Sequence, residues 1–259
     1  MTSSGTAPAY PDGRGLLAGK RVVVTAAAGT GIGFATAKRC AEEGAVVAIS
    51  DRHERRLAES AERLAEVMGS EVVALACDVT VEADVQRMFD AVGPFDVLVN
   101  NAGLGGTAAL VDMTDEQWDA VVGVTLTGTM RCTREALRRL RAAGKGGAVV
   151  NNASVVGWRA QAGQTHYAAA KAGVMALTRC AAVEAAEFGV RVNAVAPSLA
   201  MHENLAKVTT DELLAELTAR EAFGRAAEPW EIANVIVFLA SDLASYLTGE
   251  VISVSSQHP

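Results

Sequence analysis

Apolar and polar positions follow a regular rhythm along this chain. From Lys20 onward, short apolar runs rich in β-branched residues alternate with longer amphipathic stretches rich in alanine. The short runs predict β-strands, and the amphipathic stretches predict α-helices. The predicted strands are residues 21–25, 46–50, 71–77, 95–100, 147–153, 191–196 and 251–254. The predicted helices are residues 32–43, 54–68, 81–92, 115–142, 164–188 and 229–241, with a shorter one at 210–221.

The predicted strands are apolar along nearly their whole length. Such strands are typical of a parallel sheet that has helices on both faces. Because the alternation shows neither an internal repeat nor a linker, we predict an α/β fold with a single doubly wound domain and a seven-stranded parallel sheet. We expect this domain to span residues 16–259, preceded by a flexible leader at residues 1–15, which is rich in Ser, Gly and Pro.

Composition narrows the classes of partner. The 259 residues carry a net charge of −7 and no basic run that could follow a phosphate backbone, which argues against nucleic acid. No uninterrupted apolar stretch reaches the roughly 18 residues that a membrane span needs. The N-terminus lacks the cationic and apolar regions of a signal peptide. We therefore expect a soluble, cytoplasmic protein that does not bind membranes.

Cysteine and histidine usage argues against a metal site. The chain has four cysteines and four histidines, without a Cys-x-x-Cys pair or a close His/Cys cluster. The cysteines are interpreted as buried thiols of a reducing compartment. They are Cys40, Cys77, Cys132 and Cys180.

A glycine-rich turn follows the first predicted strand. Gly29, Gly31 and Gly33 lead into a helix whose first N–H groups could receive a pyrophosphate. Asp51, just after the second strand, could accept hydrogen bonds from an adenosine ribose and would repel a 2′-phosphate. We therefore favour NAD, with NADP as the alternative because the neighbouring Arg52 could accommodate that phosphate. A tight turn followed by an N-cap aspartate is the purely structural alternative.

Three residues form a candidate proton-transfer site. Tyr167 and Lys171 are four positions apart on a predicted helix, and therefore on one face of it. A tyrosine with an ordinary pKa of about 10 is a poor acid–base catalyst near neutral pH, and we expect the lysine cation to lower that pKa. Ser154, thirteen residues before Tyr167, could hold a substrate oxygen. The alternative is an alanine-rich helix that carries Tyr and Lys on its surface.

With these motifs in order, the chain resembles the short-chain dehydrogenase/reductase family from Leu17 to Ser256. Further motifs carry the resemblance: Asp78-Val79, Asn100-Asn101-Ala102-Gly103, Asn193-Ala194-Val195-Ala196-Pro197 and Tyr246-Leu247-Thr248-Gly249. The resemblance implies a Rossmann-type fold and hydride transfer between a nicotinamide cofactor and a secondary alcohol or ketone, with Tyr167 as general acid or base. The cofactor-binding residues it implies are Gly29, Thr30, Gly31, Ile32, Gly33, Asp51, Arg52, Asp78, Val79, Asn101, Ala102, Gly103, Tyr167, Lys171, Pro197 and Ala200.

Four departures from the family pattern accompany these matches. Ala27 stands where the first glycine of the turn belongs, so we expect one extra residue there. Thr125 aligns with a fourth catalytic residue, an asparagine that bends its helix and holds a water of the proton relay. Threonine has no amide, but its hydroxyl could bind a water. Pro197-Ser198 replaces a Pro-Gly pair, and residues 254–257, Val-Ser-Ser-Gln, replace the usual Asp-Gly-Gly.

The segment at 198–225 interrupts the rhythm and is expected to form a small helical substrate lid. Its apolar positions Leu213, Leu214 and Leu217 fit packing against an apolar ligand or ordinary core packing. Between Ser154 and Tyr167, where the family has its active-site rim, Trp158 could cover a ring system. Arg159 could pair with a carboxylate or phosphate or be a structural surface residue. The predicted substrate-binding residues are Ser154, Trp158, Gln161, Gln164 and Tyr167.

The substrate expected from the resemblance is a thioester. Residues 151–161 resemble an actinobacterial subgroup that includes the reductase of steroid C/D-ring catabolism, which would act on a hydroxylated indane-type acyl-CoA. A simple 3-oxoacyl or 3-hydroxyacyl thioester is the other option. A catalytically impaired NAD-binding scaffold or redox sensor of the same fold is the alternative function. The resemblance also implies a homodimer or homotetramer that pairs through the helices at 115–142 and 164–188.

Overall fold

Seven parallel strands form the centre of the molecule in a computed structural model, which describes residues 6–201 and 211–257, without the side chains of 211–213. The strand order is β3-β2-β1-β4-β5-β6-β7, with all neighbours parallel. This confirms the predicted doubly wound sheet. The strands are β1 Arg21–Thr25, β2 Val46–Asp51, β3 Val73–Ala76, β4 Val97–Asn100, β5 Gly147–Asn152, β6 Val190–Pro197 and β7 Val251–Val254.

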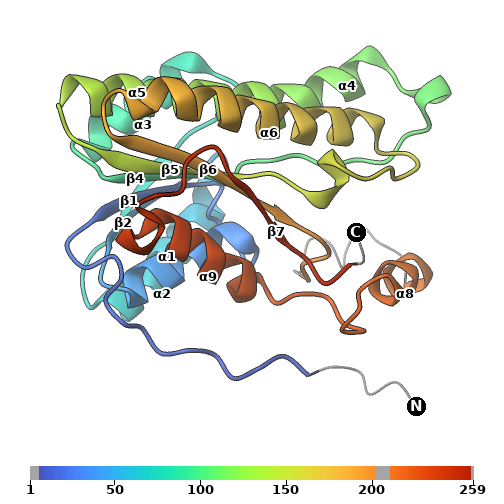
Figure 1. Ribbon diagram of the computed structural model, residues 1–259, viewed down its shortest axis with the longest axis horizontal. Coiled ribbons are helices and arrows are strands. Elements are labelled where there is room, and N and C mark those ends of the chain that lie inside the picture. Colours follow the sequence, from blue (N-terminus) through green and yellow to red (C-terminus); the bar gives the residue numbers. More distant parts are fainter. Residues whose placement is uncertain (1–5, 202–210, 258–259) are drawn as a thin grey trace.

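Helices cover both faces of the sheet (Figure 1). One layer contains α1 Ile32–Glu42, α2 Glu54–Met68 and α9 Pro229–Ala240. The other contains α3 Glu82–Val92, α4 Asp115–Val122, α5 Thr129–Ala142 and α6 Thr165–Ala186. A hydrophobic cluster fills the space between the sheet and each layer. Helix α8, Asp211–Ala219, belongs to the segment predicted to form a lid and lies apart from both layers, beyond the ends of β6 and β7.

The predicted helix 115–142 has the bounds that the sequence indicated. Within it, a π-helical stretch, Gly123–Gly128, lies between α4 and α5, and the backbone at both junctions is helical. The predicted strand 71–77 is shorter, at Val73–Ala76, because β3 is an edge strand that pairs only with β2.

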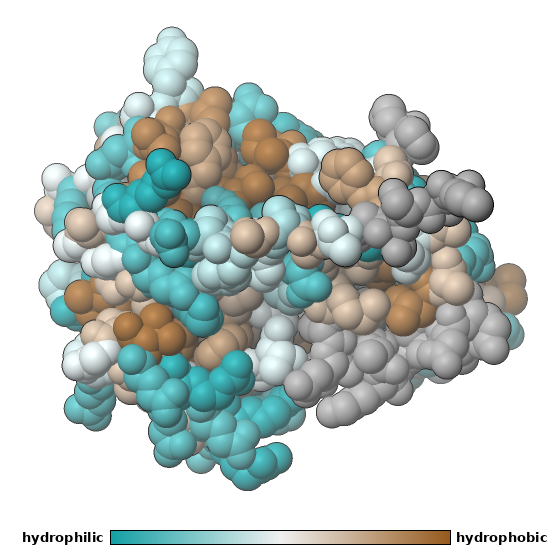
Figure 2. All heavy atoms as spheres, turned by 90° about the horizontal axis from the view of Figure 1, so that it is seen from below, coloured by the Kyte–Doolittle hydropathy of each residue, from teal (hydrophilic) through white to brown (hydrophobic). Residues whose placement is uncertain are grey.

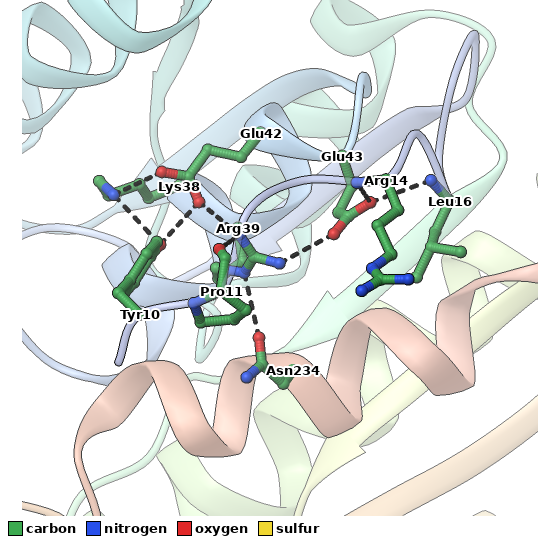
Figure 3. Close-up of polar contacts among 9 residues, drawn as sticks. All are labelled: Tyr10, Pro11, Arg14, Leu16, Lys38, Arg39, Glu42, Glu43 and Asn234. Atoms are coloured by element: carbon green, nitrogen blue, oxygen red, sulfur yellow. Dashed lines mark hydrogen bonds and ion pairs between the residues drawn. The ribbon is translucent and has the colours of Figure 1, made fainter. Parts of the chain in front are cut away.

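Residues 10–15 of the segment expected to be a flexible leader, together with the following Leu16, contact α1 and α9 (Figure 3). The Tyr10 ring lies edge-on against Trp230, and its hydroxyl donates to Glu42 at 2.6 Å. Buried Glu43 accepts hydrogen bonds from the backbone N–H groups of Arg14 and Leu16, at 2.8 and 3.0 Å. The segment is thus fastened across the outer side of this helical layer.

The face of the molecule on the side of α1 and α9 mixes hydrophilic areas with an apolar patch (Figure 2). Exposed apolar side chains on α9 and the turn after it are Phe238, Leu243 and Tyr246.

Among the helices of the described residues, none combines the length and apolar character that a membrane crossing requires.

Candidate active site

Ser154 lies at the carboxyl end of β5, where a parallel sheet collects its ligands. It caps the short 3₁₀ helix η3, Val155–Gly157, by accepting a hydrogen bond from the Val156 N–H at 3.3 Å. The turn packs tightly on α6: a Cβ at Gly157 would lie 2.8 Å from Met175 Cε and 3.0 Å from the backbone nitrogen of Ala172. Glycine at 157 therefore lets Ser154 approach the α6 residues that complete the site.

Tyr167 and Lys171 lie one turn apart on α6, as the spacing predicted. The Lys171 ammonium nitrogen is 5.5 Å from the centre of the Tyr167 ring. The Ser154 side chain lies near enough to the Tyr167 phenol to lower its pKa. Lys171 Nζ donates to the backbone oxygen of Asn152 at 2.5 Å. The structure thus brings the three predicted residues into one constellation.

Burial governs the protonation of both α6 residues. It raises the pKa of the Tyr167 phenol, and the neighbouring Ser154 side chain only partly opposes that rise. Burial also lowers the pKa of Lys171 to about 8. The expectation that the Tyr167 pKa lies below its ordinary value is therefore not met in this structure, because burial disfavours the charged phenolate. At neutral pH the phenol stays protonated, and Lys171 is the group whose pKa moves toward neutral.

Thr125 is buried in the π-helical stretch, close to Lys171. A Cβ on Gly103 would lie 3.6 Å from Lys171 Nζ and 3.9 Å from Thr125 Oγ1. The Thr125 hydroxyl accepts from the N–H of Leu104 at 3.0 Å and donates to its carbonyl oxygen at 3.2 Å. Its proton and one lone pair are thus engaged by the chain itself.

The glycine turn forms a close junction between β1 and α1. A Cβ on Gly33 would lie 2.4 Å from both the Ala26 carbonyl oxygen and the Asn101 Nδ2, so no larger residue fits there. Ala26 itself takes a left-handed conformation with φ of 51°. Thr25 Oγ1 receives the Asn101 N–H at 3.0 Å and the Ala102 N–H at 3.2 Å. The turn and the 101–103 segment are therefore fixed to each other.

Asp51 ends β2 and faces the glycine turn. Its carboxylate accepts hydrogen bonds from the N–H groups of Ala28, at 3.3 Å, and His53, at 2.9 Å. Two α2 residues that the sequence analysis missed also support the turn. Ser60 Oγ accepts from the Gly29 N–H at 3.0 Å, and Arg63 donates to the Gly29 oxygen at 3.3 Å. They sit inside an amphipathic helix and carry no motif that would mark them.

Two asparagines join the turn to the catalytic end. Asn101 Nδ2 donates to the Ala26 oxygen at 3.0 Å, and Asn152 Nδ2 donates to Asn101 Oδ1 at 3.0 Å. Asn152 Oδ1 is buried and has no hydrogen-bond partner among the described residues. Asn152 was not among the predicted site residues, although a pair of asparagines at the end of an apolar strand was a usable signal.

The remaining predicted cofactor residues lie at the same edge of the sheet. Burial alone would raise the pKa of Asp78, but hydrogen bonds from Thr80 and the Arg52 charge hold it below its ordinary value. Arg52 is exposed, and Val79 is buried. Pro197 ends β6, and Ala200 forms an isolated bridge with Ala227. Neither of these two contacts the Ser154, Tyr167 and Lys171 constellation through a hydrogen bond.

The predicted substrate-binding side chains Trp158, Gln161 and Gln164 are partly exposed to solvent. Trp158 is half exposed, and Gln161 and Gln164 lie between the rim and α6, with Gln164 capping that helix. In the lid, Leu214 and Leu217 are half-buried, while the side chain of Leu213 lies outside the described residues. The middle of the predicted lid, residues 202–210, also lies outside them.

The chain's own groups fit a dinucleotide. The first turn of α1 begins at Gly31 without a side-chain cap, so its N–H groups can receive a phosphate. The Asp51 carboxylate is placed for a ribose, and Lys171 and the orphaned Asn152 Oδ1 are placed at the other end. By contrast, the described residues contain no group of three or more His, Cys, Asp or Glu that could hold a metal ion.

Comparison with known proteins decides the family. A family model described as "Enoyl-(Acyl carrier protein) reductase" matches residues 26–256. A crystal structure of a short chain dehydrogenase from Mycobacterium smegmatis is 58% identical, with a TM-score of 0.86, and the match covers 98% of this chain and 99% of that one. The chain belongs to the short-chain dehydrogenase/reductase family. Members of this family generally bind NAD or NADP, and the resemblance predicted from the sequence is confirmed.

Two relatives in this family have names that state their activity. A Mycobacterium tuberculosis (strain ATCC 25618 / H37Rv) protein named (5R,7aS)-5-hydroxy-7a-methyl-1-oxo-2,3,5,6,7,7a-hexahydro-1H-indene-carboxyl-CoA reductase is 62% identical, and the match covers 98% of each chain. A cis-4-hydroxycyclohexanecarboxylate dehydrogenase from Sinomonas cyclohexanicum is 42% identical, over 91% of this chain and 95% of the relative. These short-chain dehydrogenase/reductase relatives and the intact Ser, Tyr and Lys make this chain an oxidoreductase.

Proposed function

We propose that this chain transfers hydride between NAD and a ring ketone or secondary alcohol of a steroid-derived, hydroxyindane-type acyl-CoA. The observation that carries the proposal is its 62% identity, over nearly the whole of both chains, to a reductase whose named substrate is a hydroxylated indene carboxyl-CoA. The Ser154, Tyr167 and Lys171 constellation supports the same chemistry. The words "acyl carrier protein" in the family description agree with a thioester substrate.

In this proposal each residue of the constellation has one role. Tyr167 gives its hydroxyl proton to the carbonyl oxygen during reduction and takes it back during oxidation. Ser154 hydrogen-bonds that oxygen and holds it beside the phenol. Lys171 places a positive charge near the phenol and stabilises its deprotonated form. When bound, the nicotinamide supplies or accepts the hydride. Burial keeps the phenol neutral, which is the form that donates a proton.

The cofactor choice rests on the end of β2. The Asp51 carboxylate would accept hydrogen bonds from the ribose and repel a 2′-phosphate, which favours NAD. Arg52 is exposed and its charge acts on Asp78. We therefore expect kcat/KM to be higher with NAD(H) than with NADP(H), and Asp51→Ser to narrow that difference. An unchanged preference in the variant would contradict the role of Asp51.

Turnover of a substrate panel tests the proposed function. Purified protein is assayed with hydroxyindane-type carboxyl-CoA thioesters and with simple 3-oxoacyl-CoA thioesters, each with both cofactors. We expect a higher kcat/KM for the ring substrates. Higher kcat/KM for linear thioesters would instead favour the simple 3-oxoacyl option. NAD binding without turnover of either set would favour the catalytically impaired scaffold.

We also propose that the chain forms a homodimer or homotetramer through the α4–α6 side. Val183 and Trp118 are exposed apolar residues on α6 and α4, and several alanines of α6 are also exposed. Burial of this side by a second copy would remove these residues from water. Light scattering at micromolar concentration should give a dimer or tetramer mass, and a monomer mass would contradict the proposal.

A further inference from the structure

Glu221 is a buried carboxylate that follows the lid helix α8. It is only 4% exposed and accepts four hydrogen bonds. The donors are Ser198 Oγ at 3.1 Å, the Leu199 N–H at 3.3 Å, Ser256 Oγ at 2.7 Å and Gln257 Nε2 at 2.9 Å. A carboxylate offers about four acceptor positions, so this one is fully satisfied. Its buried charge is therefore compensated by dipoles from several segments.

These donors come from the ends of two strands. Ser198 and Leu199 follow β6, and Ser256 and Gln257 follow β7, which runs toward the side of the molecule where α8 lies (Figure 1). Glu221 thus fastens the base of the lid to the carboxyl edge of the sheet. Ser198 and the pair Ser256-Gln257 stand where the family pattern has glycines. Two of the four departures from the family pattern therefore supply the side chains that bind Glu221.

Gln257 contacts both Glu221 and Arg159 through its side-chain amide. Its Nε2 donates to Glu221, so its Oε1 faces the other way and accepts from Arg159 Nη1 at 2.6 Å. A flipped amide would set its NH₂ group against the guanidinium and its oxygen against the carboxylate. Glu221 therefore fixes which end of the Gln257 amide meets Arg159.

Arg159 belongs to the rim of the candidate active site. It follows η3, five positions after Ser154, and its N–H donates to the Val155 oxygen at 2.9 Å. Its side chain is part-buried, and within the described ranges no carboxylate lies at ion-pair distance from it. A guanidinium has five N–H donors in a fixed fork suited to carboxylate and phosphate. Among the residues that the structure describes, Arg159 thus presents an oriented cation without an acidic partner.

We propose that Arg159 binds an anionic group of the substrate, a carboxylate or a phosphate, and that Glu221 positions Arg159 through Gln257. The proposal rests on the proposed function, because it concerns the substrate of the same site. Arg159 is in this view a specificity-determining residue, and Glu221 and Gln257 are positioning residues that act through it.

Three forms of one substrate separate the two anionic groups. They are the CoA thioester, the N-acetylcysteamine thioester of the same acid, which lacks phosphates, and the free carboxylate. We expect Arg159→Met to raise KM about 10- to 100-fold, the range for a charge-assisted hydrogen bond, with kcat within about twofold. The effect should fall on the CoA thioester if the group is a phosphate and on the free acid if it is a carboxylate. An unchanged KM for all three would overturn the proposal.

Glu221→Gln and Gln257→Leu test the positioning role. Each should raise KM for the same substrate as Arg159→Met, and Arg159→Lys should restore only part of the loss. In the double variant Arg159→Met/Glu221→Gln, we expect no further increase beyond that of Arg159→Met. A fully additive increase would contradict positioning through Arg159. The matched control is Arg220→Met, which removes an exposed arginine paired with Glu216 next to Glu221 and should leave KM unchanged.

Calorimetric titration of the full chain with coenzyme A and with the free acid does not depend on turnover. Weaker binding of either probe to Arg159→Met, with wild-type binding to Arg220→Met, supports the proposal even if the proposed reaction fails. Binding of neither probe to the wild-type chain, or equal binding to Arg159→Met, overturns it. Absence of turnover together with an Arg159-dependent anion affinity would refute the proposed function alone.

Discussion

Lys171 is a cation buried at the centre of the candidate site. It is 3% exposed, and burial lowers its pKa to about 8. The unfolded chain has an ordinary lysine pKa near 10.5, so the folded state binds fewer protons between pH 8 and 10.5. Burial of this charge therefore costs stability in full below pH 8, and the cost disappears as pH rises through 10.5.

Lys171→Met should stabilise the fold while abolishing activity. The shift corresponds to roughly 3 kcal/mol, and loss of the hydrogen bond to the Asn152 oxygen offsets part of it, so we expect a gain of about 1–2 kcal/mol at pH 7. The gain should disappear and become a small loss near pH 10.5, because the cost of burying the charge is gone there while the hydrogen bond is still missing. Urea denaturation at pH 7 and pH 10 measures both values. A variant less stable than wild type at pH 7 would contradict this interpretation.

Thr125 links the π-helical stretch to the segment after Asn101. Its hydroxyl makes both hydrogen bonds to Leu104, and Gly103 lies between it and Lys171. Thr125→Val keeps the shape but leaves the Leu104 N–H and carbonyl without these partners. We expect it to cost about 1–2 kcal/mol and to lower kcat/KM at least tenfold, whereas Thr125→Ser should stay within about threefold of wild type. Equal effects of the two substitutions on kcat/KM would rule out the hydroxyl's role.

At this scale the sequence indicated Ser154, Tyr167 and Lys171 because a helical spacing of four and a strand end fix their places. It could not indicate Glu221 or Leu104. Glu221 acts through contacts with segments 22 to 36 residues away, and Leu104 acts through backbone atoms that every residue carries. No local pattern marks such partners, whereas Asn152 follows an apolar strand as one of two adjacent asparagines, a signal that was open to use.

The bounds of helices and strands could be predicted where the hydrophobic pattern alone sets the ends of the element. Strands β1 and β7 and helix α2 begin and end where the hydrophobic pattern changes. The π-helical stretch at Gly123–Gly128 was not predicted, and its Thr125 hydroxyl bonds Leu104, 21 residues away along the chain, a contact that no local pattern marks. Edge strand β3 is shorter than its apolar run for a similar reason, since its extent depends on one neighbour.

At the scale of elements, Glu43 allows the contribution of the contact between residues 10–16 and α1 to stability to be measured. Glu43 is 2% exposed, pairs with buried Arg39 at 2.8 Å and receives two backbone N–H groups. Burial alone would raise its pKa, but these hydrogen bonds and the Arg39 charge hold it below its ordinary value. Its contribution to stability is therefore present above about pH 4.5 and is lost as pH falls below that value.

Glu43→Gln should destabilise the protein by about 2–4 kcal/mol at pH 7, because it leaves a buried guanidinium with only part of its compensation from Glu42. The matched control is Glu59→Gln, which breaks an exposed ion pair with Arg55 and should cost about 0.5 kcal/mol or less. Urea denaturation of the two variants gives both numbers. Equal losses would mean that the contact with residues 10–16 contributes nothing.

At the scale of the whole molecule, the strand order follows from the rhythm of strands and helices. Parallel neighbours need crossover helices, and right-handed crossovers place them on both faces, so the doubly wound sheet could be predicted. The same geometry sets Gly33, Asp51 and Ser154 at one edge, where the cofactor and substrate would meet. The position of α8 and the path of residues 10–16 depend on single contacts and could not be predicted.

Our central claim is that Tyr167 exchanges the proton in hydride transfer on a ring substrate of the acyl-CoA type. The most direct test is kcat of Tyr167→Phe with a hydroxyindane-type carboxyl-CoA, measured beside the affinity for NADH. We predict a fall in kcat of about 10²- to 10⁴-fold with the NADH dissociation constant unchanged within about threefold. A variant that keeps kcat within fivefold of wild type would contradict the claim.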